Sequence, residues 1–229
     1  MKPVISVRGL WKNYLDDDGD ETAALRGIDL DLMPGEVVAL YGKSGSGKTT
    51  LLNLLAGLDF PTRGTITVDG NDLAGLGEKG RTLLRRRRLG FVFQFFNLLP
   101  TLTAFENIFL SLELSGAADP EAVYRSLDGV GLAGKHGRFP HELSGGEQQR
   151  VAIARAIVKA PAIILADEPT GNLDTNTGIE IIRMLADYSR ANGALLLMAT
   201  HSTRTCRFVD RILRIDDGIV HEEATCTEV

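Results

Sequence analysis

A glycine-rich octet, Gly-Lys-Ser-Gly-Ser-Gly-Lys-Thr, occupies residues 42–49 and directly follows a short β-branched run, Val37 to Tyr41. A helical pattern over Thr49 to Leu58 comes next, so this part of the chain reads strand, loop, helix. Glycines at these spacings let successive backbone N–H groups turn toward one centre, and the helix N-terminus adds the positive end of its dipole. The octet therefore predicts a phosphate-binding loop within an α/β domain.

The residues of this loop are candidate ligands for a nucleoside triphosphate. Lys48 would place a positive charge on the β- and γ-phosphates, and the Thr49 hydroxyl would bind Mg²⁺. The candidate nucleotide-binding residues in and beside the loop are Gly42, Lys43, Ser44, Gly45, Ser46, Gly47, Lys48, Thr49 and Thr50. ATP and Mg²⁺ are the cofactors that this pattern predicts.

Two adjacent acids follow a second apolar strand, Ala162 to Ala166. This strand would deliver Asp167 and Glu168 to the carboxyl edge of the sheet, where open α/β sheets bind ligands. Asp167 would hold Mg²⁺, and Glu168 would orient and polarise the attacking water. Acids after a strand also cap helices, but beside a phosphate loop the pair indicates a P-loop ATPase.

Strands alternate with helices along most of the chain. Strands are expected at Val4–Val7, Ile28–Leu32, Val37–Tyr41, Thr65–Val68, Phe91–Phe93, Ile163–Ala166, Ala194–Ala199 and Arg211–Ile215, and helices at Thr49–Leu58, Ala122–Asp128, Glu147–Val158 and Gly178–Ser189. An acidic turn is expected at 16–21. The alternation predicts an α/β fold with a largely parallel sheet. Residues 95–155 lack strong strand patterns, which favours a helical subdomain there.

The segment Leu143 to Arg150, Leu-Ser-Gly-Gly-Glu-Gln-Gln-Arg, resembles the signature motif of the ATP-binding-cassette (ABC) family. Physically it is a second small anion site, in which a serine hydroxyl and free backbone N–H groups open a helix. An ordinary capped helix would explain a Ser-Gly start but not the whole octet. The resemblance implies that this motif closes over the γ-phosphate of ATP held by a second, head-to-tail copy of the chain. The candidate residues for that contact are Ser144, Gly145, Gly146 and Glu147.

Other segments match family motifs in the same order along the chain. Gln94 matches the Q-loop glutamine that senses Mg²⁺ and the attacking water, and His201 matches the switch histidine that contacts the γ-phosphate. Gly171 to Asp174 resembles the D-loop, which links the two active sites, and this makes Asp174 a site candidate. Tyr14 resembles the aromatic that stacks on adenine. A partly buried hairpin aromatic would also fit Tyr14.

The resemblance runs from about Val4 to Val220 and implies one ABC nucleotide-binding domain over residues 1–229. It implies a P-loop NTPase (RecA-like) core over about 1–94 and 156–229 with an antiparallel β subdomain, and a helical signature subdomain over about 95–155. The implied catalytic residues are Glu168, His201 and Gln94, and the implied metal ligands are Thr49, Gln94 and Asp167. Ser202 departs from the acid that many relatives carry after the histidine.

Composition limits the partners and the compartment. The net charge of -5 and the pI near 5.4 give no general attraction to nucleic acid. Apolar runs fall far short of the roughly 20 residues of a membrane span, and no signal peptide is expected at the N-terminus. Two cysteines, Cys206 and Cys226, suggest free thiols in a reducing compartment. We therefore expect a cytoplasmic chain. The family resemblance implies that it is held on the inner face of the membrane through integral membrane permease subunits.

The sequence allows two interpretations for each of two further segments. The run Arg85 to Arg88 could bind lipid or nucleic acid, but the solvated end of a helix is the favoured interpretation. The apolar run Phe95 to Pro100 could be core, or could form the groove that receives a permease's cytoplasmic coupling helix. We expect a mixture of the two across this run, which includes Phe95 and Leu99.

Within the ABC family the chain is most similar to the ATPases of the lipoprotein-releasing and macrolide-exporter group. The similarity lies in the acidic insertion between Tyr14 and Leu25 and in the segments 89–100, 102–107 and 166–174. The chain ends soon after His201, so no extra regulatory domain is expected. This similarity implies export or membrane extraction of a lipophilic or envelope substrate.

Other assignments are an importer ATPase, a soluble ABC ATPase of DNA repair or translation, a non-hydrolysing regulator and a small-molecule kinase. The chain has no heptads and is too short for two cassettes, which disfavours the soluble ATPases. Intact Glu168, Gln94 and His201 disfavour a regulator, and the signature octet disfavours a kinase. The motifs common to all ABC ATPases do not distinguish export from import, and they do not identify the substrate.

Overall fold

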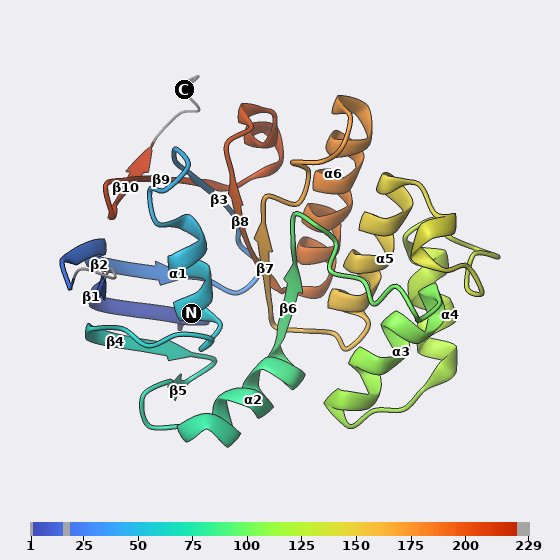
Figure 1. Cartoon of the computed structure of the whole chain (residues 1–229), viewed down its shortest axis with the longest axis horizontal. Coiled ribbons are helices and arrows are strands. Elements are labelled where there is room, and N and C mark those ends of the chain that lie inside the picture. The colour runs from blue at the N-terminus through green and yellow to red at the C-terminus, as the bar shows by residue number, and fades with distance from the viewer. Residues whose placement is uncertain (1, 16–18, 224–229) are drawn as a thin grey trace.

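The chain folds into two β-sheets flanked by helices, and the computed structural model describes residues 2–15 and 19–223 (Figure 1). The strands are β1 (Ile5–Leu15), β2 (Glu21–Leu32), β3 (Val37–Tyr41), β4 (Arg63–Val68), β5 (Asn71–Asp72), β6 (Leu89–Val92), β7 (Ile163–Asp167), β8 (Leu195–Thr200), β9 (Arg211–Asp216) and β10 (Ile219–Glu223). The helices are α1 (Lys48–Leu55), α2 (Gly77–Arg88), α3 (Ala104–Ser115), α4 (Pro120–Gly129), α5 (Gly145–Ile157) and α6 (Thr175–Asn192), with 3₁₀ helices η1 (Pro140–Glu142) and η2 (Thr203–Phe208).

The larger sheet has the strand order β10-β9-β3-β8-β7-β6. All its pairings are parallel except the one between β9 and β10, which form an antiparallel hairpin. The largely parallel α/β core predicted from the sequence is confirmed. Because parallel strands share one direction, the loops that follow β3, β6, β7 and β8 meet at one edge of this sheet.

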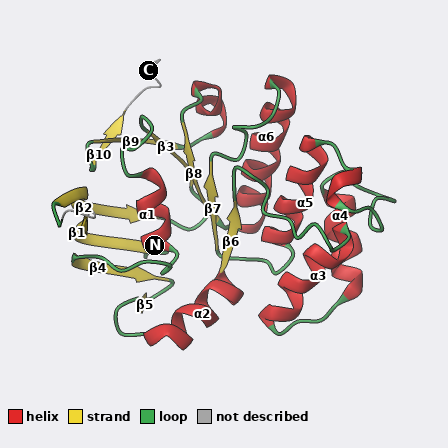
Figure 2. Cartoon of the chain, viewed as in Figure 1, coloured by secondary structure: helices red, strands yellow, loops and turns green. Residues whose placement is uncertain are grey.

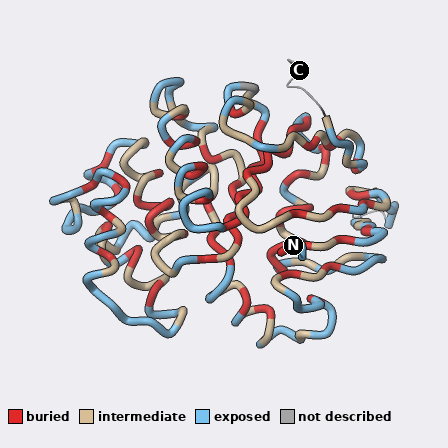
Figure 3. The backbone as a smooth tube through the Cα atoms, turned by 180° about the vertical axis from the view of Figure 1, so that it is seen from behind, coloured by how far each residue is buried: buried red, intermediate tan, exposed pale blue. Residues whose placement is uncertain are grey.

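Alternate residues of the parallel strands enter two separate hydrophobic cores. In β7, Ile163 and Leu165 belong to one buried cluster, while Ile164 and Ala166 belong to the other. Successive side chains of a strand point to opposite faces, so a sheet covered on both faces needs apolar residues throughout. This explains why the central strands are continuous apolar runs, and Figure 3 shows the buried backbone concentrated in them.

The smaller sheet is antiparallel, with the order β2-β1-β4-β5, and lies to one side of α1 (Figure 2). Its strands β1 and β2 extend well beyond the predicted Val4–Val7 and Ile28–Leu32. Their outer halves carry many exposed residues, so periodicity did not reveal them. Residues 16–18 of the predicted acidic turn lie outside the described part of the chain, and Glu21 begins β2.

Helices α3, α4 and α5 pack together on the side of the parallel sheet away from the antiparallel sheet (Figure 1). Helix α5 begins at Gly145, two residues before the predicted start, because Ser144 caps it. The division into core and helical subdomain near residues 95 and 155 stays a prediction.

The arginine run Arg85 to Arg88 ends helix α2, as predicted, but two of its members are held by the protein rather than by solvent alone. Arg85 donates to the Gly57 carbonyl at 2.7 Å, and Arg88 pairs with Asp69 at 2.6 Å. The run therefore links the end of α2 to the turns that follow α1 and β4.

Two further findings concern the expected compartment. Cys206 is disulfide-bonded, so the prediction of free thiols is wrong for this residue, and Cys226 lies outside the described residues. Sequence separation carries no information on whether two cysteines meet in space. Across residues 2–15 and 19–223, no helix combines the length and the apolar character needed to span a bilayer.

Candidate functional site

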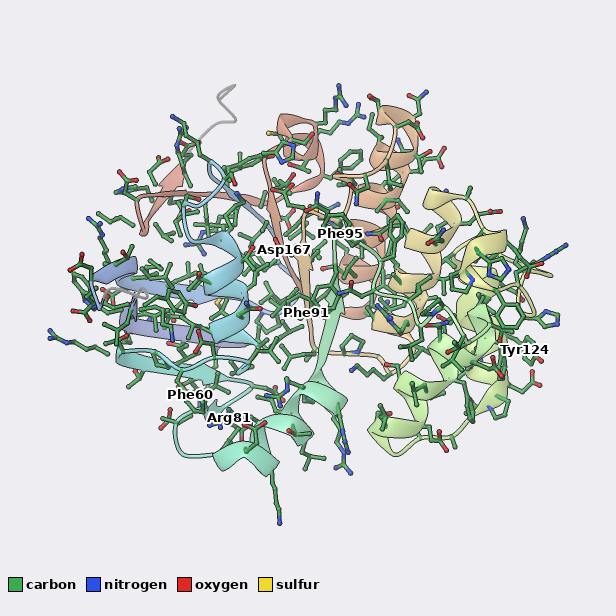
Figure 4. All side chains as sticks on the ribbon, in the orientation of Figure 1. Phe60, Arg81, Phe91, Phe95, Tyr124 and Asp167 are labelled. Carbon is green, nitrogen blue, oxygen red and sulfur yellow. The ribbon has the colours of Figure 1, made fainter. Side chains whose placement is uncertain are left out.

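Four loops at the carboxyl edge of the parallel sheet carry the predicted catalytic side chains. Lys48 and Thr49 begin helix α1 after β3, and Gln94 follows β6. Asp167 ends β7 with Glu168 next to it, and His201 follows β8. Figure 4 shows Asp167 at the end of β7, near the loop that contains Phe95.

These residues line one cavity of about 500 Å³. Its lining is Ala24, Ser44, Gly45, Gly47, Lys48, Thr49, Thr50, Gln94, Asp167, Glu168 and His201. The structure thus brings together, in one chain, the predicted phosphate loop, both acids, and the residues predicted as Q-loop glutamine and switch histidine, Gln94 and His201. Tyr14, Asp174 and residues 144–147 are not part of this lining.

The phosphate loop is held open by its own lysine. The Lys48 ammonium is buried and donates to the carbonyl oxygens of Gly42 at 2.7 Å and of Lys43 at 3.1 Å. Ser46 is buried as well, and its hydroxyl has no partner in the structure. A glycine-rich loop at a helix N-terminus that also carries a cation is a site for an anion, and a phosphate chain fits it.

Position 47 requires glycine for two reasons, its positive φ and the close approach of neighbouring atoms. Its φ is +108°, and an added Cβ would lie 2.7 Å from the Ala24 carbonyl oxygen. Gly45 has φ of +80° but open space around the same position. A side chain at Gly45 would therefore meet backbone strain alone, whereas a side chain at Gly47 would meet backbone strain and steric overlap.

We predict that Gly47→Ala lowers the free energy of unfolding by about 3 kcal/mol, and Gly45→Ala by about 1 kcal/mol. Urea denaturation of both variants measures this difference. Equal losses would show that the contact with Ala24 does not constrain the loop.

The acids are held in a network that spans three loops. Oγ1 of Thr49 donates to Oδ2 of Asp167 at 2.9 Å. Oε2 of Glu168 lies 2.8 Å from Nδ1 of His201, and Oε1 lies 3.9 Å from Nζ of Lys48. Glu168 has φ of 47°, a backbone region that costs energy for a non-glycine residue and often occurs at functional sites.

Burial raises the pKa of Asp167, and the neighbouring charge of Glu168 raises it further, while Thr49 and Lys48 oppose the shift. Such a carboxylate is stabilised by a divalent cation, which supplies the missing positive charge. Thr49 and Asp167 also offer the hard oxygen ligands that Mg²⁺ prefers, with room for phosphate oxygens. The residues present therefore fit Mg²⁺ bound together with a nucleotide.

Gln94 is connected to the segment after β7 by contacts that sequence reasoning missed. The Asn172 amide donates to the Gln94 carbonyl at 3.0 Å. At Gly171 an added Cβ would lie 2.8 Å from Nε2 of Gln94. The glycine of the predicted D-loop thus leaves space for the glutamine of the predicted Q-loop, and no local pattern indicates this contact.

Tyr14 is fixed beside the cavity by a polar group that the sequence did not indicate. Its hydroxyl donates to Oδ2 of Asp59 at 2.9 Å, and the Lys12 ammonium lies 4.7 Å from the ring centroid. Burial is the main reason that the pKa of Tyr14 is raised, and its hydroxyl also interacts with Thr50, a residue of the cavity lining. Tyr14 is 43% exposed, so the residue retains accessible surface beside the site.

The signature residues form a helix N-terminus at a separate place. Ser144 caps α5, and Oε2 of Glu147 accepts from the Ser144 backbone N–H at 2.8 Å. Oε1 of Glu147 pairs with Lys135 at 2.6 Å, which lowers the pKa of Glu147 to about 2. An added Cβ on Gly146 would lie 2.7 Å from the Thr177 methyl group. The motif is therefore a capped helix start, and its residues 144–147 do not line the cavity at the phosphate loop of the same chain.

Asp174 caps helix α6 through bonds from the backbone N–H groups of Asn176 and Thr177 at 3.0 and 3.1 Å. It also lines a second, smaller hollow of about 180 Å³ together with Glu168 and His201. Glu168 and His201 line both hollows, whereas Asp174 lines only the second. Asp174 therefore lies in a hollow that adjoins the first cavity.

Comparison with known proteins agrees with this arrangement. Residues 25–171 match the family model of the ABC transporter. The lipoprotein-releasing system ATP-binding protein LolD of Pseudomonas syringae pv. tomato is 48% identical over 221 residues, which are 95% of this chain and 96% of that protein. The macrolide export ATP-binding/permease protein MacB of Rhodopirellula baltica is 43% identical over 96% of this chain but only 33% of its own length.

The solved dimeric structure of the ATP-binding cassette MJ0796 bound to ADP and Pi superimposes with a TM-score of 0.89 at 37% identity. The match covers 98% of this chain and 100% of that one. The predicted P-loop NTPase fold with an antiparallel sheet and a helical region is confirmed. The chain belongs to the ABC transporter family and is an ATP-hydrolysing ABC cassette.

Proposed function

We propose that two copies of the chain pack head to tail and enclose two ATP molecules. One face of each nucleotide would meet residues 42–49 of one copy, and the other face would meet Ser144 and Gly146 of the second copy. Two observations support this arrangement. The catalytic cavity and the signature helix start are both preformed but lie apart in a single chain, and MJ0796 is dimeric in its solved structures.

Within each composite site the residues would divide the work of hydrolysis. The Lys48 ammonium would leave the carbonyls of Gly42 and Lys43 and donate instead to oxygens of the β- and γ-phosphates. Glu168 would orient a water in line with the γ-phosphorus and draw off its proton. His201, whose Nδ1 lies 2.8 Å from Oε2 of Glu168, would contact the γ-phosphate and keep the carboxylate aligned.

We propose that Thr49, Asp167 and Gln94 hold Mg²⁺ when the nucleotide binds. The ion would neutralise charge on the phosphate oxygens. The remaining residues at the edge of the cavity would bind the nucleoside: Tyr14 would stack on adenine, positioned by Asp59 and Lys12.

We further propose that the chain drives a separate membrane permease and resides in the cytoplasm on the inner face of that membrane. The chain matches one third of MacB, a protein named as both ATP-binding and permease, and this match supports a permease as the partner of the chain. The relatives named LolD and MacB favour export or extraction of a lipophilic or envelope substrate.

The segment Phe95 to Pro100 offers a docking surface for such a partner. Phe95 is 71% exposed and Leu99 is 45% exposed, whereas Leu98 packs against a hydrophobic core. These exposures and the packing of Leu98 support the expected mixture of core and docking roles. Large exposed apolar side chains beside a catalytic loop indicate an interaction surface.

Purification of the tagged chain from its native membranes, with mass spectrometry of the proteins retained, tests this function. The proposal predicts a permease with a large extracytoplasmic domain, and a cysteine at Leu99 should crosslink to one of its cytoplasmic segments. Crosslinking to the transmembrane subunit of a binding-protein-dependent importer would overturn the export assignment but not the ATPase chemistry. Retention of no membrane protein would overturn the transport assignment.

A further inference from the structure

One side of helix α2 carries three cations that pair with no acid of the fold. Lys79, Arg86 and Arg87 are exposed, and across residues 2–15 and 19–223 none of them has a carboxylate within ion-pair distance. Residues three or four apart lie on the same side of a helix, so these cations form one stripe together with Leu83. We call this stripe the α2 outer face. Figure 1 shows α2 at the lower edge of the molecule.

The acids close to the other arginines of α2 are already paired. Glu78 is the one carboxylate in the sequence of α2, and it accepts from Arg81 at 2.9 Å and from Arg85 at 2.8 Å. The bonds from these two arginines lower the pKa of Glu78 to about 2. Arg88 pairs with Asp69 at 2.6 Å. The outer face is therefore a local positive patch on a chain whose net charge is -5.

An apolar hollow of about 230 Å³ adjoins these cations. Along α2 its lining includes Leu76, Gly80, Leu83 and Leu84, followed by Arg87. Leu83 is 48% exposed. One exposed leucine is ordinary on a protein surface, but here the leucine adjoins both an apolar hollow and a group of unpaired cations. This combination indicates a surface for a partner that is both anionic and apolar.

We infer that the α2 outer face contacts an anionic lipid surface. Lys79, Arg86 and Arg87 would lie at the lipid phosphates, and Leu83 would lie at the boundary between headgroups and acyl chains. Long basic side chains can place their charge at a phosphate while their stems cover apolar surface. The inference goes beyond the proposed function, because it adds a direct contact with lipid to the contact with a permease.

The composition of the outer face favours lipid over nucleic acid. A nucleic acid would offer phosphates to the cations but no apolar layer to Leu83 and the hollow. Proteins that bind single strands also stack aromatic side chains on the bases, and the sequence of α2 contains no aromatic residue. Because the whole chain is acidic, its general attraction to a polyanion is absent, and the contact depends on this face.

Flotation of the full chain with lipid vesicles tests the inference. Vesicles made of equal parts phosphatidylglycerol and phosphatidylcholine are the probe, and vesicles of phosphatidylcholine alone are the comparison. We expect the chain to float with the anionic vesicles only, and the bound fraction should fall as salt is added. Equal binding to both kinds of vesicle, or binding to neither, would overturn the inference.

Substitution of the two arginines tests the contribution of charge. The double variant Arg86→Ser, Arg87→Ser should lose affinity for the anionic vesicles by about tenfold or more. The double variant Arg86→Lys, Arg87→Lys should keep most of it, because an ammonium also supplies a positive charge at a phosphate. The matched control is Arg26→Ser, Arg183→Ser, which removes the same charge from exposed positions on β2 and α6. Equal losses in the test and control variants would overturn the inference.

Leu83→Ser tests the apolar contribution while every charge stays in place. Its affinity for the anionic vesicles should fall about threefold or more, because less apolar surface leaves water on binding. Ile219→Ser is the matched control, since Ile219 is 42% exposed on β10. Because the substituted side chains are exposed, all variants should unfold at the wild-type temperature. Wild-type affinity in Leu83→Ser would overturn the choice of lipid over a purely polar polyanion.

The same proteins, measured with double-stranded DNA in place of vesicles, distinguish the two kinds of phosphate partner. We expect no DNA binding that depends on the outer face. DNA binding by wild type that is lost in Arg86→Ser, Arg87→Ser would overturn the assignment to lipid. None of these measurements contains a permease, so a failure of this inference and a failure of the proposed function are distinguishable.

Discussion

Glu168→Gln should bind ATP with wild-type affinity and hydrolyse it about a thousandfold more slowly. The amide keeps the size of the carboxylate and can still hold a water, but it cannot draw off the proton. The Glu168 carboxylate lies between two other residues of the cavity, 2.8 Å from His201 Nδ1 and 3.9 Å from Lys48 Nζ. A neutral amide there leaves the phosphate-binding residues in place.

The same variant should accumulate as an ATP-dependent dimer in size-exclusion chromatography, because the bridging γ-phosphate persists. Phosphate release and elution volume with ATP or ADP measure both effects. Glu121→Gln is a matched control, since Glu121 is exposed on α4, away from the site. Turnover in Glu168→Gln near the wild-type rate would show that another group acts as the base.

Lys48→Ala should fail at an earlier step and lose about a hundredfold or more in nucleotide affinity. The buried ammonium is the cation of the phosphate loop, and in the structure it also satisfies the carbonyls of Gly42 and Lys43. Its removal takes away both the attraction for the phosphates and the internal support of the loop.

Thermal unfolding with and without Mg²⁺ and ATP distinguishes this loss from misfolding. Ligand binding raises the unfolding temperature of a protein that can bind it. Wild type and Lys79→Ala should both show the increase, and Lys48→Ala should remain folded but show none. An equal increase in Lys48→Ala would remove Lys48 from nucleotide binding.

The parts of the fold that the sequence predicted are those determined locally. The strands β3, β7 and β8 are continuous apolar runs because both faces are covered, and this burial is visible in the residues themselves. The phosphate loop and the signature helix start depend on glycine angles and on a serine cap within a few residues. Such features need no knowledge of distant contacts.

The parts that escaped prediction depend on residues far apart in the chain. Tyr14 is held by Asp59, and Gln94 is held by Asn172. Neither contact leaves a periodic or spacing signal, because the two partners of each contact lie far apart in the sequence. The full lengths of β1 and β2 were not predicted for another reason. Their outer halves are solvent-exposed and carry no apolar alternation.

A mixture of Lys48→Ala chains and Ser144→Arg chains tests the central claim, that each ATP lies between two copies. Each variant alone should be inactive, because every composite site in it carries a lesion. In a mixed head-to-tail dimer, one site has both lesions and the other has neither. Random pairing should therefore restore ATP hydrolysis to about a quarter of the wild-type rate. A mixture as inactive as its components, with both chains folded and forming mixed dimers, would contradict the shared site.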